Sequence, residues 1–285
     1  MTTTAAESTR VASWRLLLRN PVTVVSATVL AFIVFVAVAA NWITPFAVND
    51  VNVPNALQPP SGQHWFGTDE LGRDVLSRVL VAIQASMRIA VVSVAFAVVV
   101  GVTVGLVAGY RGGWIDTVFM RVVDVMFAFP VLLLALAVVA ILGPGTTTTI
   151  LAIGIVYTPI FARVARGSTL SVRVEPFVQM SRAMGTGDRY ILARHIVPNI
   201  AGPLIVQTSL SLAFAILSEA ALSFLGLGIQ PPQPSLGRMI FDSQGFVTMA
   251  WWMAVFPGAA IFVIVPAFNL VGDGLRDCWI PSSAP

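Results

Sequence analysis

Two long apolar runs in this chain are separated by the polar segment EPFVQMSRAMGTGDRYILARHIVP, residues 175–198. Pro176 suits the first turn of a helix and Gly185 suits the residue just past its end, so a helix is predicted over Pro176–Met184. Asp188 has the character of a cap for a second short helix, which Pro198 would end. The segment therefore predicts two short helices outside the apolar part of the chain.

The first of these predicted helices is amphipathic. Phe177, Met180 and Met184 recur at i, i+3 and i+7, which places them on one face. Gln179 and Arg182 point elsewhere. A helix of this length is marginal alone in water, so we expect it to pack against another element.

The composition places the whole chain in a membrane. Of its 285 residues 57% are apolar and only 10% are charged, and the mean hydropathy is +0.87. A soluble domain would carry roughly a quarter charged residues. The sequence therefore predicts an integral membrane protein made of helices.

Several kinds of chemistry are excluded by missing residues. All 16 basic residues are Arg, so there is no P-loop lysine and no self-contained nucleotide site. Cys278 is the only cysteine, and His64 and His195 are far apart, so no metal site and no catalytic residues are predicted. The Arg residues flank apolar runs, which gives no indication of nucleic-acid binding. Any ATP and magnesium that drive this protein would be bound by another chain.

Apolar runs predict six transmembrane helices: Val22–Ala40, Ile89–Gly109, Thr117–Gly143, Thr146–Ala162, Ile200–Leu222 and Ala250–Val271. The chain divides into a cytoplasmic segment 1–20, a first transmembrane helix 21–43, an extracytoplasmic segment 44–88, a core 89–272 of five transmembrane helices that includes the cytoplasmic loop 167–198, and a tail 273–285. Ala37-Val38-Ala39 resembles a signal-peptide cleavage site, but the apolar run is longer than such peptides carry, which favours an uncleaved span.

The segment 44–88 ends in an amphipathic pattern. Leu71, Val75, Val79 and Ile83 repeat every four residues, and i, i+4 charge pairs are predicted for Asp69 with Arg73 and for Asp74 with Arg78. We expect a helix that lies at the membrane surface. A surface that receives a substrate-binding protein is the functional alternative.

The Arg positions set the orientation. With a cytoplasmic N-terminus, twelve of the 16 Arg lie inside, and the outside keeps Arg73, Arg78, Arg88 and Arg238. This predicts a multi-pass protein of the cytoplasmic membrane with both termini and the loop 167–198 in the cytoplasm.

Some residues inside the predicted spans stand out. Glu219 is the intramembrane candidate, for which structural pairing is favoured over a role in translocation. Arg121 and Asp124 are interpreted as an ion pair at the membrane boundary. Gly101, Gly105 and Gly109 are spaced for close helix packing. The prolines that predict kinks are Pro130, Pro159, Pro203, Pro257 and Pro266.

The central segment resembles the EAA loop of ABC-transporter permeases. The loop's spacing places its triplet on Gln179-Met180-Ser181, its glycine on Gly185 and its proline on Pro198; the Glu-Ala-Ala triplet itself is replaced, and His195 stands where isoleucine is usual. Further likeness to the second permease subunit of dipeptide and oligopeptide importers lies in four stretches, FGTDELGRDVLSRVL (66–80), GYRGGWIDTVFMRVVDVMFAFP (109–130), SEAALSFLGLGIQPP (218–232) and FNLVGDGLRD (268–277).

The resemblance implies a type I ABC importer permease fold and a set of partners. These would be a homologous sister permease, one or more ATPase subunits that bind ATP and magnesium, an extracytoplasmic substrate-binding protein and membrane lipid. In such permeases the loop docks into a groove on the ATPase. The residues that this implies for coupling are Glu175, Pro176, Phe177, Gln179, Met180, Ser181, Arg182, Ala183, Met184, Gly185 and Pro198.

The function predicted is ATP-driven import of dipeptides or short oligopeptides, without catalysis by this chain itself. Import of another small solute, such as haem, a nickel chelate or glutathione, is the first alternative. An ion-driven secondary transporter would need ionisable groups near mid-membrane and an internal repeat, and neither is clear in the sequence. A membrane-embedded enzyme would need a nucleophile with its base, or metal ligands, at membrane depth.

Overall fold

The computed structural model describes residues 21–279, and side chains for 21–277. The segment predicted as a cytoplasmic N-terminus, 1–20, and the last six residues lie outside this range. Within it the secondary structure is helical, apart from one isolated β-bridge between Thr68 and Asp74. Five helices are long and apolar enough to cross a membrane, or six if a bent pair counts as one span.

The first two long helices are α2 (Pro21–Ile43) and α3 (Val75–Arg111). α2 contains the whole of the apolar run Val22–Ala40 that predicts the first span. α3 has 37 residues, about 55 Å at a rise of 1.5 Å per residue. Asp74 caps its start, because its carboxylate accepts hydrogen bonds from the Ser77 backbone N–H and hydroxyl, both at 2.8 Å.

The separate surface helix predicted before residue 89 is wrong. Its residues from Val75 onward are the first turns of α3, which runs on into the span because neither proline nor glycine interrupts it before Gly101. Val75 and Val79 are buried in the protein core rather than placed against lipid.

One of the two charge pairs predicted for this region is confirmed. Arg73 Nε lies 2.6 Å from Asp69 Oδ2. Asp74 instead bonds His64 Nδ1 at 2.9 Å, and Arg78 Nε lies 3.4 Å from Asp69 Oδ2, so the predicted Asp74–Arg78 pair is wrong. Asp74 is occupied by capping α3, which turns its carboxylate away from Arg78.

The third predicted span is interrupted. It consists of α4 (Gly113–Phe127) and α5 (Val131–Leu142), whose axes differ by 93° across the break at residues 128–130. Pro130 precedes α5, where its fixed ring and missing N–H end the preceding helix rather than merely kinking it. The fourth span is α6 (Thr146–Val172), which continues about three turns beyond the predicted end at Ala162.

After α6 the chain forms α7 (Pro176–Ala183), the single turn α8 (Asp188–Tyr190), a π-helical turn (Ile191–Ile196) and the long helix α9 (Val197–Phe224). Pro198 was predicted to end a short helix, and this is wrong, because it lies in the first turn of α9. The π turn shifts the hydrogen-bond pattern, with Val197 N–H bonded to the Leu192 carbonyl, and so the helix passes through the proline. Asp188 was predicted to cap the second short helix, but the N-cap of α8 is Gly187.

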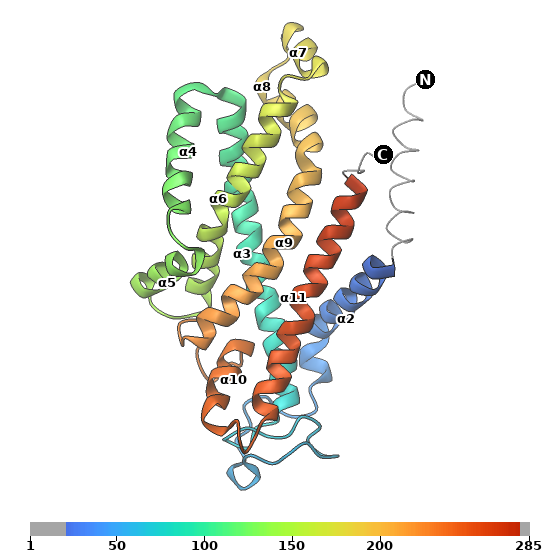
Figure 1. Cartoon of the computed structure of the whole chain (residues 1–285), viewed down its shortest axis with the longest axis vertical. Coiled ribbons are helices and arrows are strands. Elements are labelled where there is room, and N and C mark those ends of the chain that lie inside the picture. Colours follow the sequence, from blue (N-terminus) through green and yellow to red (C-terminus); the bar gives the residue numbers. More distant parts are fainter. Residues whose placement is uncertain (1–20, 280–285) are drawn as a thin grey trace.

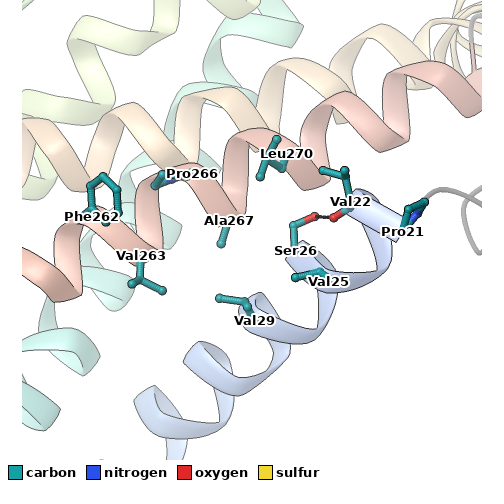
Figure 2. A pocket seen from close by; sticks show the side chains of 10 residues that line it. All are labelled: Pro21, Val22, Val25, Ser26, Val29, Phe262, Val263, Pro266, Ala267 and Leu270. Carbon is teal, nitrogen blue, oxygen red and sulfur yellow. Dashed lines mark hydrogen bonds between the residues drawn. The ribbon is translucent and has the colours of Figure 1, made fainter.

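The last two α-helices of the described range are α10 (Leu236–Ser243) and α11 (Trp252–Trp279). Residues 273–279, predicted as a tail, belong to α11. α7 and α8 lie at the end of the bundle toward which α11 runs, and α10 and the segment 44–74 lie at the opposite end (Figure 1). Trp252 ties that segment down by donating from Nε1 to the Thr68 carbonyl at 3.0 Å.

The core lies between α3, α6, α9 and α11. α3 packs most extensively on α6, and the predicted glycines explain why. A Cβ at Gly101 would come within 2.5 Å of the Thr158 carbonyl, and one at Gly109 within 2.9 Å of Thr169 Cβ. The close packing predicted from the glycine spacing is therefore confirmed.

Candidate functional site

The candidate site is α7 with the turn that follows it. Pro176 occupies its first turn and Met184 its C-cap, as the sequence predicts to within one residue. Gly185 has φ +78°, its N–H bonds the Arg182 carbonyl at 3.0 Å, and Thr186 N–H bonds the Ser181 carbonyl at 3.1 Å. This is a Schellman motif, which needs a left-handed residue at Gly185.

One face of α7 is fixed to the bundle. Val178 is fully buried and Ser181 is 8% exposed. Val178 belongs to a small apolar cluster whose other members come from α3, the π turn and α9: Tyr110, Ile191, Ile196 and Ile200. The periodicity of the sequence did not identify Val178 as a buried residue. Its position between the apolar residues Phe177 and Met180 was a signal that it could be one.

The opposite face of α7 is open. Phe177, Met180 and Met184, the three residues predicted to share a face, are 41%, 65% and 75% exposed. Glu175, Pro176, Gln179, Arg182, Ala183 and Gly185 are also exposed. Pro198 lies on α9 and is not part of this face. The helix thus presents flexible apolar side chains, two of them methionines, to whatever lies beyond the bundle.

Polar contacts orient α7 on its sides. His195 Nε2 lies 3.4 Å from Ser181 Oγ, and the centre of its ring lies 6.0 Å from that of Phe177 and 5.8 Å from that of Tyr190. His195 thus contacts α7 through both a polar atom and its ring. The Arg182 guanidinium lies 5.0 Å from the centre of the Tyr110 ring.

Tyr110 links α3 to the segment that follows α7. Its hydroxyl donates to Asp188 Oδ1 at 2.6 Å. Arg173 Nη1 donates to the Gly109 carbonyl at 2.7 Å, at the C-terminal end of α3. A surface hollow of about 670 Å³ is lined by Tyr110 and Arg173 together with Arg111 and Arg182. Tyr110 and Arg173 were missed because their partners are 64 to 78 residues away in sequence.

Glu219 lies elsewhere, inside the bundle. It is fully buried, and its carboxylate accepts from Ser86 Oγ of α3 at 2.5 Å and from Ser223 Oγ at 2.7 Å. Both carboxylate oxygens thus have a donor from the protein. This supports the pairing interpretation over a role in translocation.

Asp124 has a different partner from the predicted one. It pairs with Arg163 of α6 at 2.9 Å, and no ion pair joins it to Arg121. Arg121 lies one turn away on the same helix, but Arg163 approaches from across the α4–α6 contact.

One further polar feature, at Glu70, lies outside the site. At the other end of the molecule burial raises the pKa of Glu70, with the neighbouring Asp69 adding to the effect. Among the described residues no group of three His, Cys, Asp or Glu side chains could hold a metal ion.

The chain shows similarity to known transport proteins over almost its whole length. Residues 101–281 match the family described as "Binding-protein-dependent transport system inner membrane component", and residues 9–60 match "N-terminal TM domain of oligopeptide transport permease C". The chain belongs to this family of ABC-transporter permeases. It is accordingly a multi-pass inner-membrane component of a transport system and is not itself catalytic.

Two relatives are similar to this permease over most of its length. The dipeptide transport system permease protein DppC of Alkalihalophilus pseudofirmus is 42% identical over 96% of this chain and 91% of the relative. The glutathione transport system permease protein GsiD of Escherichia coli O6:K15:H31 is 44% identical over 94% of this chain and 89% of the relative.

The fold also has a solved counterpart. An inward-facing structure of the MetNI methionine ABC transporter superposes with a TM-score of 0.60, at 17% identity, over 72% of this chain and 97% of that one. The all-helical ABC importer permease fold is thus confirmed, with five or six candidate spans in place of the six predicted.

Proposed function

We propose that this permease forms half of the translocation pathway of an ATP-driven importer for dipeptides and short peptides, glutathione included. The dipeptide permease and the glutathione permease described above are nearly equally similar to it, which supports short peptides as the shared substrate class. A homologous sister permease, an ATPase that binds ATP and magnesium, and an external substrate-binding protein complete the transporter.

The ATPase is coupled through α7. The observation that carries this is the contrast between its two faces, since Val178 is fully buried while Met180 and Met184 are 65% and 75% exposed. A helix of 8 residues that left its apolar face in water would be unstable alone, and a soluble partner with an apolar groove supplies the missing cover.

The orientation follows from the same reasoning. Because the ATPase is cytoplasmic, α7 and the C-terminal end of α11 face the cytoplasm, and α10 and the segment 44–74 face outward (Figure 1). Arg173, Arg182, Arg189 and Arg194 then lie on the inside, in agreement with the distribution of positive charge.

The coupling is tested by Met180→Asp in the complete transporter reconstituted in proteoliposomes. A carboxylate in an apolar groove costs several kcal/mol unless it is paired, so ATP-dependent uptake of labelled dipeptide falls by at least about tenfold. Val174→Asp is the matched control, since this valine is 59% exposed, precedes α7 and lies off the Phe177–Met180–Met184 face. Equal uptake by the two variants would remove α7 from the mechanism.

The substrate class is tested in the same vesicles. Uptake of a labelled dipeptide and of labelled glutathione is measured with the cognate binding protein and ATP, and with ATP omitted. Concentration of either peptide only when ATP is present supports the proposal. Uptake that follows an imposed proton or sodium gradient without ATP supports a secondary transporter instead.

A further inference from the structure

The break between α4 and α5 leaves unusual backbone at the surface of this subunit. Residues 128–130 are exposed, and the helices on either side meet at 93°. Pro130 stands at the N-cap of α5 and gives no side-chain hydrogen bond to the first N–H groups of that helix. These donors need a partner outside the helix.

Charged side chains gather beside the break. Asp124 and Arg163 form an ion pair of 2.9 Å although their side chains are 58% and 54% exposed. The Arg163 guanidinium also lies 4.0 Å from the centre of the Phe127 ring, which holds it against the last turn of α4. Arg121, one turn before Asp124, is exposed and has no hydrogen bond or ion pair with any described residue.

A lipid environment does not fit this face. α4 and α5 are apolar enough to cross a membrane only as a pair, so the break lies within that candidate span. Irregular backbone at membrane depth is tolerated only where protein covers it or water reaches it, and exposed charges there are costly for the same reason.

A dry contact with another subunit fits poorly as well. Such a contact would remove water from the Asp124–Arg163 pair and from Arg121, whose charge has no partner in this chain. Burying an unpaired guanidinium is unfavourable unless the partner supplies an acid. Water satisfies all these groups together.

We propose that the surface formed by residues 121–130 and Arg163 lines a water-filled passage and binds the charged ends of a zwitterionic peptide. This rests on the proposed function. Arg121 receives the peptide carboxylate, and Asp124 exchanges its half-exposed partner Arg163 for the peptide ammonium group. An ion pair this exposed contributes little, so the exchange is easy and the peptide is not trapped.

The proposal is tested by thiol accessibility in the complete transporter, with Cys278→Ser as background. Phe129→Cys places a thiol at the break, where the native side chain is 54% exposed, and Phe35→Cys on α2 is the control, with 59% exposure in an uninterrupted apolar helix. Membrane-impermeant reagents are applied on both sides, without nucleotide and with a non-hydrolysable ATP analogue.

Phe129→Cys reacts at least tenfold faster than Phe35→Cys in one of the two nucleotide states, because water reaches it. An anionic reagent reacts several-fold faster than a cationic one of equal size, and Arg121→Gln removes most of that preference. A Phe129→Cys thiol as unreactive as the control in both states would overturn the passage. Equal rates for the two reagents would overturn the carboxylate site.

This test does not depend on coupling through α7. Labelling at residue 129 requires water but no transport, and the Met180→Asp experiment requires transport but no change at the break. Loss of one result with the other intact therefore shows which proposal fails.

Discussion

At the scale of single residues, Gly185 is the position where backbone conformation matters most for the site. Its φ of +78° directs the chain from α7 toward α8, and the same residue aligns the two hydrogen bonds that close the helix. No heavy atom lies within 4 Å of a Cβ built there, so the constraint is conformational and not steric. A side chain at this position strains the backbone without meeting a neighbour.

Gly185→Ala is expected to destabilise the end of α7 by about 1 to 2 kcal/mol, since an L-residue disfavours the left-handed region by that amount. ATP-dependent uptake falls while the protein still inserts and assembles. Gly187→Ala is the control, because Gly187 has φ −65° and equally open surroundings. Uptake and thermal stability that are the same in both variants would show that the turn at Gly185 has no such role.

At the scale of the helix, the contact between α3 and α6 holds the bundle together. Gly101, Gly105 and Gly109 lie on the face of α3 that meets α6, and each has a neighbour too close for a Cβ. Close approach of helix backbones compensates in a membrane for the weak hydrophobic drive between apolar helices. The contact therefore depends on missing side chains, and a single added methyl group perturbs it.

Gly101→Ala is expected to lower stability by about 1 to 3 kcal/mol through overpacking against Thr158 and Phe161. Gly258→Ala on α11 serves as its control, since no heavy atom lies within 4 Å of the added carbon. Thermal unfolding of the detergent-purified transporter measures both. A melting temperature that is unchanged in Gly101→Ala would contradict the packing described for α3 and α6.

At the scale of the whole molecule, α7 is connected to the spans by one small cluster. Val178 contacts residues of α3, the π turn and α9 through the group that contains Tyr110, Ile191 and Ile196. A displacement of α7 by the ATPase would thus reach two long helices through Val178 and the residues packed against it. Rigid packing is what allows such a displacement to be passed on and not absorbed locally.

Val178→Ala is expected to remove about 1 to 3 kcal/mol of packing and to leave a small cavity under α7. Uptake then falls several-fold, whereas ATP hydrolysis by the assembled transporter continues, because movement of α7 is no longer transmitted in full. Val174→Ala changes an exposed valine four residues earlier and leaves both activities as they are. A parallel fall of uptake and hydrolysis in Val178→Ala would indicate loss of assembly instead.

Much of the site could be predicted because it depends on local chemistry. The start of α7 follows from Pro176 and its end from Gly185, since these residues restrict or free their own backbone. The spacing of Phe177, Met180 and Met184 predicts that they share one face of α7. It does not predict that this face is exposed, since burial depends on what packs beside the helix. Tyr110 and Val178 were missed for that reason.

Three features differ from the prediction for identifiable physical reasons. Proline commonly ends a helix, but at Pro198 the preceding π turn compensates for the missing hydrogen bond and the helix continues. Arg121 was the sequence neighbour of Asp124, yet Arg163 of another helix is its partner. Pro130 predicted a kink within residues 117–143, but the hydropathy of this range is that of a single span and did not predict a break with a bend of 93°.

By itself the sequence determined the membrane class, the absence of lysine and hence of a P-loop in this chain, the approximate bounds of α2 and α9 and the ends of α7, because composition and backbone preference are carried by each residue and its near neighbours. The tertiary structure alone decided that Ser86 meets Glu219 across 133 residues, that Val178 anchors α7 and that the third span is broken. These depend on which helices meet and at what angle, and that is settled by the packing of the whole chain.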